Sequence, residues 1–228
     1  MTVRSVIFDL YGTLTPTIPK ASYDATLEAV ADRLDVNRGR FRNEWHDTGE
    51  IRVAGDHADL HDYIVWLCNR LGTQVGQGAI DHCVVLMNDL VRPLLLHPRG
   101  EAVPTLKKLK EAGLTIGLIS DCSSEIPAIW RESPLAKEIL NPVFSCEVAC
   151  KKPAIEIYQE GLRRLGSAPE ETMFVGDGGS NELCGALQAG LIPVLYRPPE
   201  MEEAYRPEAQ EWNGRRVDSL LSLLTLVN

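Results

Sequence analysis

The sequence predicts an α/β fold, with a three-layer, Rossmann-like parallel sheet core and an inserted α-helical cap domain. From residue 97 onward, short apolar runs alternate with helical segments, which is typical of parallel βαβ units. Residues 16–96 show helical periodicity without β alternation, which predicts a bundle of their own. We therefore expect the core at residues 1–15 and 97–228 and the cap at residues 16–96.

Each predicted element follows from its periodicity and from the residues at its ends. The first strand covers 6–8, and the cap helices are expected over 22–34, 37–45, 57–71 and 78–90. The later strands are expected over 114–120, 143–146, 173–175 and 192–196. The core helices are expected over 101–112, 124–131, 154–165, 181–189 and 218–226.

Composition limits the classes of partner. The 228 residues carry a formal net charge of -9, which argues against a nucleic-acid or anionic-membrane surface. No apolar stretch is long enough to span a bilayer, and the chain opens directly into a strand, so we expect no membrane span and no signal peptide. The six cysteines are scattered, and we expect reduced thiols in a cytoplasmic protein.

The first strand ends in a single carboxylate, Asp9. A wholly apolar strand is buried on both faces, and its carboxyl end lies at the sheet edge where α/β folds bind ligands. An aspartate at that position can act as a nucleophile. The segment from Asp9 to Leu14 resembles the first motif of the haloacid dehalogenase superfamily, Asp-x-Asp-Gly-Thr-Leu. Tyr11 stands where the phosphatases have a second acid, and it matches the form found in the 2-haloacid dehalogenases.

Three later strand ends also resemble motifs of this superfamily. Ser120 resembles the hydroxyl residue of the second motif, although Asp121 follows it where Asn is usual. Lys152 resembles the lysine of the third motif, and Pro153 beside it fits the first turn of a helix. Asp177 and Glu182 resemble the acidic pair of the fourth motif, at a spacing of five.

The acidic residues predict a site for Mg²⁺. Asp9, Asp177 and Glu182 would form an oxygen cage at one edge of the sheet, and buried like charges need a counter-ion. The three carboxylates carry three negative charges, which Lys152 and Mg²⁺ together would balance. A phosphate group could then enter a neutral site.

The resemblance implies an Mg²⁺-dependent phosphatase that acts on a small phosphorylated molecule. Asp9 would attack phosphorus to give an aspartyl-phosphate, and water would then cleave it. The resemblance places the ion on Asp9, the Tyr11 carbonyl oxygen, Asp177 and Glu182. The expected substrate contacts are Thr13, Ser120, Asp121, Lys152 and, on a cap loop above Asp9, Arg52.

Tyr11 keeps other functions open. With an unperturbed pKa near 10, a tyrosine hydroxyl is a poor base at neutral pH, so slow hydrolysis of alkyl phosphates is expected. A halide leaves without a proton, so a metal-independent 2-haloacid dehalogenase is an alternative. A weakly active or inactive phosphate-binding module is another. Phosphonate cleavage needs a cap lysine, which residues 21–100 lack. No motif indicates the substrate, the pathway or the oligomeric state.

Overall fold

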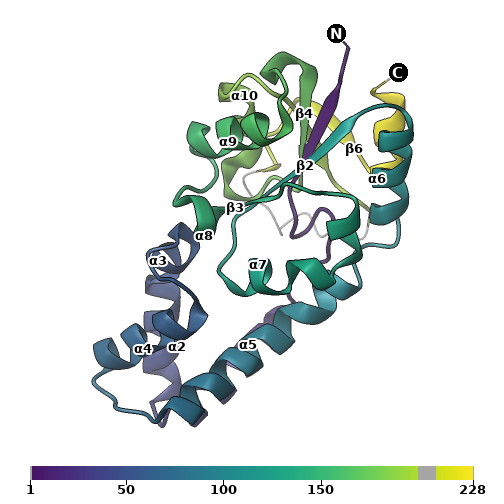
Figure 1. Cartoon of the computed structure of the whole chain (residues 1–228). Helices are drawn as coiled ribbons and strands as arrows, with labels where there is room; N and C mark the ends of the chain where they lie inside the picture. Colours follow the sequence, from purple (N-terminus) through teal and green to yellow (C-terminus); the bar gives the residue numbers. More distant parts are fainter. Residues whose placement is uncertain (1, 200–208, 228) are drawn as a thin grey trace.

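The computed structural model describes residues 2–199 and 209–227. Within these residues six strands form one sheet, in the order β3-β2-β1-β4-β5-β6, and all pairs are parallel (Figure 1). The strands are β1 (Ser5–Phe8), β2 (Thr115–Ser120), β3 (Val143–Phe144), β4 (Thr172–Gly176), β5 (Ile192–Tyr196) and β6 (Arg215–Val217). The predicted α/β class with a parallel sheet is confirmed.

The sheet is covered on both faces because its strands are apolar on both faces. In β1, Val6 and Phe8 pack into one hydrophobic cluster and Ile7 packs into another. Side chains alternate across a strand, so the two clusters lie on opposite faces. The helices over the first face are α6 (Ala102–Glu111), α7 (Glu125–Ile129) and the 3-10 helix η7 (Leu220–Thr225). The helices over the second face are α9 (Ile155–Leu165) and α10 (Glu182–Gln188).

A helical bundle is inserted between β1 and β2. It consists of α1 (Lys20–Arg33), α2 (Arg38–Asp47), α3 (Gly49–Ala54), α4 (Leu60–Leu71) and α5 (Gln77–Leu96). Its own hydrophobic cluster includes the fully buried Phe41, Trp45 and Tyr63. The bundle lies below the sheet, and the long helix α5 runs between the two parts (Figure 1). On this basis we propose the cap at residues 16–96.

Several elements differ from those the sequence predicts. Helix α5 continues through Pro93 to Leu96, because Val91 and Leu95 extend its apolar face into the core cluster. Strand β6 was not expected, because two of its three residues are arginines at the exposed edge of the sheet. The last segment is the 3-10 helix η7 and not an α-helix.

Other boundaries move by a few residues. The strand expected over 143–146 ends at Phe144, because Ser145 begins α8 (Ser145–Val148). Helix α7 ends at Ile129 and passes into a 3-10 turn. The 3-10 turns between the larger elements are η1 (Trp130–Glu132), η2 (Pro134–Lys137), η3 (Pro169–Glu171) and η4 (Gly179–Asn181).

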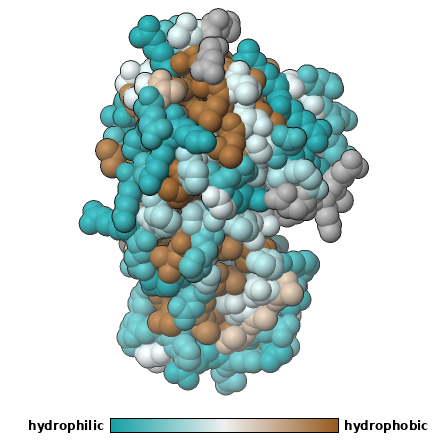
Figure 2. All heavy atoms as spheres, turned by 90° about the vertical axis from the view of Figure 1, so that its right-hand side faces the viewer, coloured by the Kyte–Doolittle hydropathy of each residue, from teal (hydrophilic) through white to brown (hydrophobic). Residues whose placement is uncertain are grey.

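The surface carries both hydrophilic areas and hydrophobic patches. Figure 2 shows hydrophilic residues over much of one face, with hydrophobic patches on both the upper core part and the lower cap part. In the described part of the chain, no helix combines the length and the apolar character that crossing a membrane requires.

Candidate active site

Three buried carboxyl groups meet at the carboxyl edge of the sheet. Asp9 follows β1, Asp177 follows β4, and Glu182 is the first residue of α10. Strands β1 and β4 are neighbours, with Phe8 opposite Val175, so the residues after them emerge side by side. Each of the three acids offers an oxygen, and these oxygens lie within 4.8 Å of one another.

The turn after β1 fixes the Asp9 side chain. The Asp9 amide donates to the Val175 carbonyl oxygen at 2.8 Å, and the Thr13 hydroxyl donates to Asp9 Oδ2 at 3.0 Å. Gly12 has a φ of +83°, and a Cβ atom there would overlap the Asp177 carboxylate. Only glycine allows this turn to approach the second acid so closely.

Lys152 joins two of the acids. Its Nζ donates to Asp9 Oδ1 at 2.5 Å and to Glu182 Oε2 at 2.6 Å, and the side chain is 3% exposed. Burial alone would lower the pKa of Lys152, but the carboxylates of Asp9 and Glu182 outweigh it and raise the pKa well above the usual value. The side chain therefore stays an ammonium that holds two carboxylates.

A β-turn presents Lys152. The Ala154 amide donates to the Lys151 carbonyl oxygen at 3.0 Å, and the Lys152 amide donates to Asp121 Oδ1 at 3.0 Å. The expectation that Pro153 lies in the first turn of the next helix is wrong. Ala154 has the non-helical backbone of an N-cap, so α9 begins only at Ile155 and Pro153 belongs to the turn.

Glu182 is held from both sides. Its Oε1 accepts from the Gly178 amide at 2.9 Å, while Oε2 accepts from Lys152. Burial, and then repulsion from Asp9, raises the pKa of this carboxyl. A Cβ atom at Gly176 would overlap the same carboxyl group, so the glycine leaves the space that Glu182 occupies.

The donor set fits a divalent cation. Three carboxyl groups and one ammonium leave a buried excess of negative charge, and carboxylate oxygens are the ligands that Mg²⁺ prefers. Asp121 adds a fourth carboxyl nearby, and burial raises its pKa against the opposing effect of Lys152.

Two cavities of about 150 Å³ each meet at this site. The acidic cavity is lined by Asp9, Tyr11, Asp121, Lys152, Asp177, Gly179, Ser180 and Glu182. The second, called here the cap cavity, lies between the core and the helical bundle, and its lining includes Tyr23, Trp45, Arg52 and Glu125. Tyr11 and Asp121 line both, so they stand at the junction between the two cavities.

A model of the haloacid dehalogenase-like hydrolase family matches residues 3–190. The chain belongs to this family. The resemblance read from its four motifs is therefore confirmed, and so is the expectation of a hydrolytic enzyme.

Two relatives match almost the whole of this hydrolase. The glyceraldehyde 3-phosphate phosphatase of Methanopyrus kandleri is 26% identical over 99% of this chain and 97% of its own. The ribulose-1,5-bisphosphate 5-phosphatase of Halopiger xanaduensis is 26% identical over 98% of this chain and 99% of its own. Among solved structures, a 2-haloacid dehalogenase from Pseudomonas syringae has a TM-score of 0.72 at 21% identity, covering 99% of this chain and 98% of that one. That likeness shows the fold alone.

Tyr11 sets this hydrolase apart from enzymes with a second acid at that position. Burial, and then the charge of Glu125, raises the pKa of the Tyr11 hydroxyl well above its usual value. The hydroxyl keeps its proton at neutral pH, so it can donate a hydrogen bond but cannot act as a base.

The remaining predicted residues lie in different places. Thr13 contacts Asp9 and Asp121 lines both cavities, whereas Ser120 is buried at the end of β2. Ser120 is not among the described residues that line either cavity. The expectation that Arg52 lies on a loop is wrong, because it is carried by α3 and lines the cap cavity.

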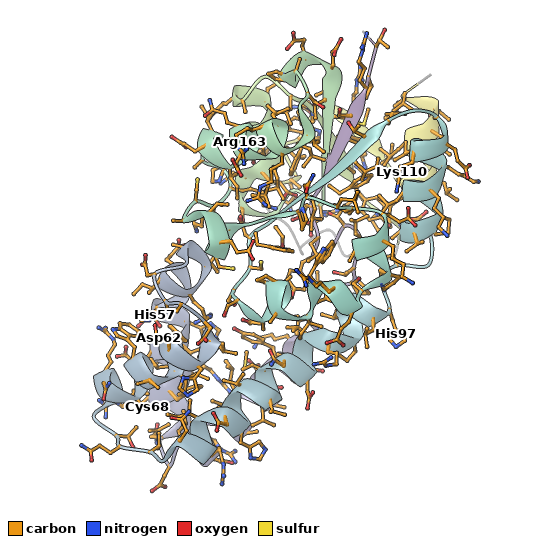
Figure 3. The ribbon with its side chains drawn as sticks, in the orientation of Figure 1. His57, Asp62, Cys68, His97, Lys110 and Arg163 are labelled. Carbon is orange, nitrogen blue, oxygen red and sulfur yellow. The ribbon has the colours of Figure 1, made fainter. Side chains whose placement is uncertain are left out.

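Sequence reasoning missed Glu125, which is 6% exposed and lines the cap cavity. A possible signal was the acid directly before the apolar run from Ile126 to Ile129. Two histidines four residues apart in the sequence, His57 and His61, lie in the cap and line neither cavity. His57 contacts Asp62 at 3.0 Å within the cap (Figure 3), and neither residue lines either cavity.

Proposed function

We propose that this hydrolase is an Mg²⁺-dependent phosphatase that acts on a small phosphorylated metabolite through an aspartyl-phosphate intermediate. The observation that carries the proposal is the buried trio of Asp9, Asp177 and Glu182 with Lys152 between two of its members. The names of two relatives, both phosphatases of sugar phosphates, support the substrate class.

Asp9 is proposed as the nucleophile. One of its carboxylate oxygens would bond to phosphorus while the bond from phosphorus to the leaving alcohol oxygen breaks, and that oxygen would take a proton from water. Water would then attack the aspartyl-phosphate, releasing inorganic phosphate and restoring the carboxylate. Thr13 holds the nucleophile in place, because its hydroxyl donates to Asp9 Oδ2.

The excess negative charge of the site would repel a phosphoryl group unless a further cation is bound. Lys152 would offset charge on the phosphoryl oxygens, and Ser120 would be a second contact to them. Mg²⁺ would be held by Asp9, the Tyr11 carbonyl oxygen, Asp177 and Glu182. When bound, the ion supplies positive charge that stabilises the negatively charged transition state.

Tyr11 favours one second candidate, a 2-haloacid dehalogenase. A halide ion needs no proton when it leaves, so this reaction would not need an acid at residue 11. The buried acidic trio weighs against it, because such a reaction has no need of three carboxyl groups gathered at one point. The phosphatase is therefore the proposed function.

A panel of phosphate esters and 2-haloacids, run with Mg²⁺ and with chelator, tests the proposal. We expect phosphate release that chelator abolishes and that Asp9→Asn removes. The matched control is Asp89→Asn, at an exposed aspartate of α5, which should retain activity. Halide release that chelator does not affect would overturn the proposal. If Asp9 binds beryllofluoride but no substrate turns over, the protein is a phosphate-binding module.

We also propose that the protein is cytoplasmic. All six cysteines are free in the structure, which is the usual state in a reducing compartment.

A further inference from the structure

The proposed mechanism leaves the cap cavity unused. This cavity is joined to the acidic cavity at Tyr11 and Asp121, which line both. A phosphate ester whose phosphorus lies at Asp9 can extend its leaving group past these two residues. The cap cavity is therefore the place where the leaving alcohol would be recognised.

Glu125, which lines this cavity, has one carboxyl oxygen without a hydrogen-bond partner. Its Oε1 accepts from the Ser123 hydroxyl at 2.9 Å, but its Oε2 is buried without a hydrogen bond. Asp121 Oδ2 is in the same condition. Buried polar atoms in native proteins are almost always hydrogen-bonded, so two such oxygens beside one cavity indicate that a bound molecule supplies their partners.

Arg52 brings the opposite charge to the same cavity from the cap. Its guanidinium lies 4.0 Å from the centre of the Trp45 ring, and Nη1 donates to the Tyr63 hydroxyl at 2.8 Å and to the Trp45 carbonyl oxygen at 3.1 Å. These contacts hold the group in one position. Arg52 and Glu125 line the same cavity, where burial raises the pKa of the Glu125 carboxyl and the positive charge of Arg52 acts against that rise.

We propose that Glu125 and Arg52 form a subsite for hydroxyl groups of the leaving alcohol, so that the substrate is the phosphate ester of a small polyhydroxylated compound. This inference rests on the proposed phosphatase function. A hydroxyl group can donate to the carboxyl oxygens of Glu125 and Asp121 and accept from a guanidinium. Whether or not it is protonated, a carboxyl group keeps an oxygen that can accept a hydrogen bond.

Other leaving groups fit this cavity less well. A carboxylated alcohol would bring a negative charge towards Asp121 and Glu125, and an alkyl group would bury their oxygens unpaired. The volume of about 150 Å³ also limits the size of the group. A cavity of that volume holds a ring of about six non-hydrogen atoms, which corresponds to a leaving alcohol of three or four carbons.

The test compares kcat/KM for glycerol 3-phosphate, propyl phosphate and 2-phosphoglycolate with Mg²⁺ present. We expect the wild-type protein to prefer glycerol 3-phosphate over each of the other two by at least about tenfold, the size of one hydrogen bond to a buried polar group. Glu125→Leu should reduce this preference to within about threefold, and Glu125→Gln, which keeps an accepting oxygen, should restore part of it.

Acetyl phosphate, whose leaving group carries no hydroxyl, reports the chemical step separately. The matched control is Glu132→Leu, whose side chain is 48% exposed and pairs with Arg92, and it should keep the full preference.

The outcomes separate the two proposals. If acetyl phosphate is hydrolysed but wild-type protein does not distinguish glycerol 3-phosphate from the other two esters, the subsite is wrong and the phosphatase stands. If Glu125→Leu keeps the tenfold preference, the subsite is also wrong. If no phosphate compound is hydrolysed, both proposals fail. Should Glu125→Leu fail to fold, the wild-type ratios and Glu125→Gln decide.

Discussion

Lys152 shows how one buried side chain can hold two buried acids together. Its ammonium is shared between Asp9 and Glu182, and all three groups are almost completely buried. Removing one partner of a buried ion pair is costly, because the remaining charges cannot return to water. The lysine therefore contributes to folding as well as to the proposed chemistry.

We predict that Lys152→Met lowers the free energy of unfolding by about 3–5 kcal/mol in the presence of chelator. Urea unfolding followed by circular dichroism measures it. The neighbouring Lys151→Met is the control, because Lys151 pairs with Glu50 at the surface, where a pair contributes about 1 kcal/mol or less. Equal losses in the two variants would contradict the structural role of Lys152.

Tyr11 offers a test of the acid–base step. Replacing it by aspartate restores a group that can protonate the leaving oxygen and then activate water. We predict that Tyr11→Asp raises kcat on alkyl phosphates by about 10²-fold, since a positioned acid–base group typically contributes about 10² to 10⁴. Acetyl phosphate, which has a better leaving group, should gain less. An unchanged or lower rate on alkyl phosphates would count against this account.

Among the helices, the short cap helix α3 packs directly against the core. It carries Arg52 and is capped at its carboxyl end by Gly55, whose φ is +76°. A Cβ atom at Gly55 would overlap the carbonyl of Cys146 in α8, so this helix end lies directly against the core. The close contact determines where Arg52 stands relative to the cap cavity.

Two helix-ending glycines separate the backbone effect from this contact. Gly72, at the end of α4, has a φ of +71° and nothing near its Cβ position. We predict that Gly72→Ala costs about 1–2 kcal/mol, the penalty of a left-handed residue. Gly55→Ala should cost at least about 1 kcal/mol more, because the overlap with backbone forces a shift. Thermal unfolding of both variants under the same conditions measures the two losses of stability. Equal losses would show that the contact between α3 and α8 does not add to the cost at Gly55.

At the scale of the whole molecule, the proposed Mg²⁺ ion is a ligand that binds the folded state. Asp177 and Glu182 are five residues apart, but Asp9 lies far from them in the sequence, so the three acids meet only after folding. A cation that they bind must therefore stabilise the folded protein.

We predict that Mg²⁺ raises the unfolding temperature, with a gain in free energy of about 2.7 kcal/mol at a hundredfold excess over its Kd. Differential scanning calorimetry with Mg²⁺ and with chelator measures the shift. Asp177→Asn should abolish it and Asp89→Asn should retain it. A wild-type protein whose Tm ignores millimolar Mg²⁺ would refute the metal site.

Much of the fold could be predicted because its signals are local. The apolar strands, the helical rhythm of the cap and the motif around Asp9 each occupy a short stretch of chain. The structure brings Asp9, Lys152, Asp177 and Glu182 together, as parallel strands with a shared carboxyl edge require. The roles of these residues stay predictions.

Three elements carried no such signal. Strand β6 is short and rich in arginine, α3 is brief, and α5 continues beyond the proline where a helix is expected to weaken. Each forms because of what it packs against: a sheet edge, helix α8, and the core cluster.

The sequence alone determined the family, the parallel sheet and the order of the acidic strand ends, because these depend on short patterns along the chain. Only the tertiary structure decided what Tyr11, Asp121, Glu125 and Arg52 do together. They come from three segments far apart in the sequence, the turn after β1, helix α3 and the stretch after β2. They line one cavity because the cap folds back over the sheet edge. Substrate choice, as proposed here, depends on that arrangement.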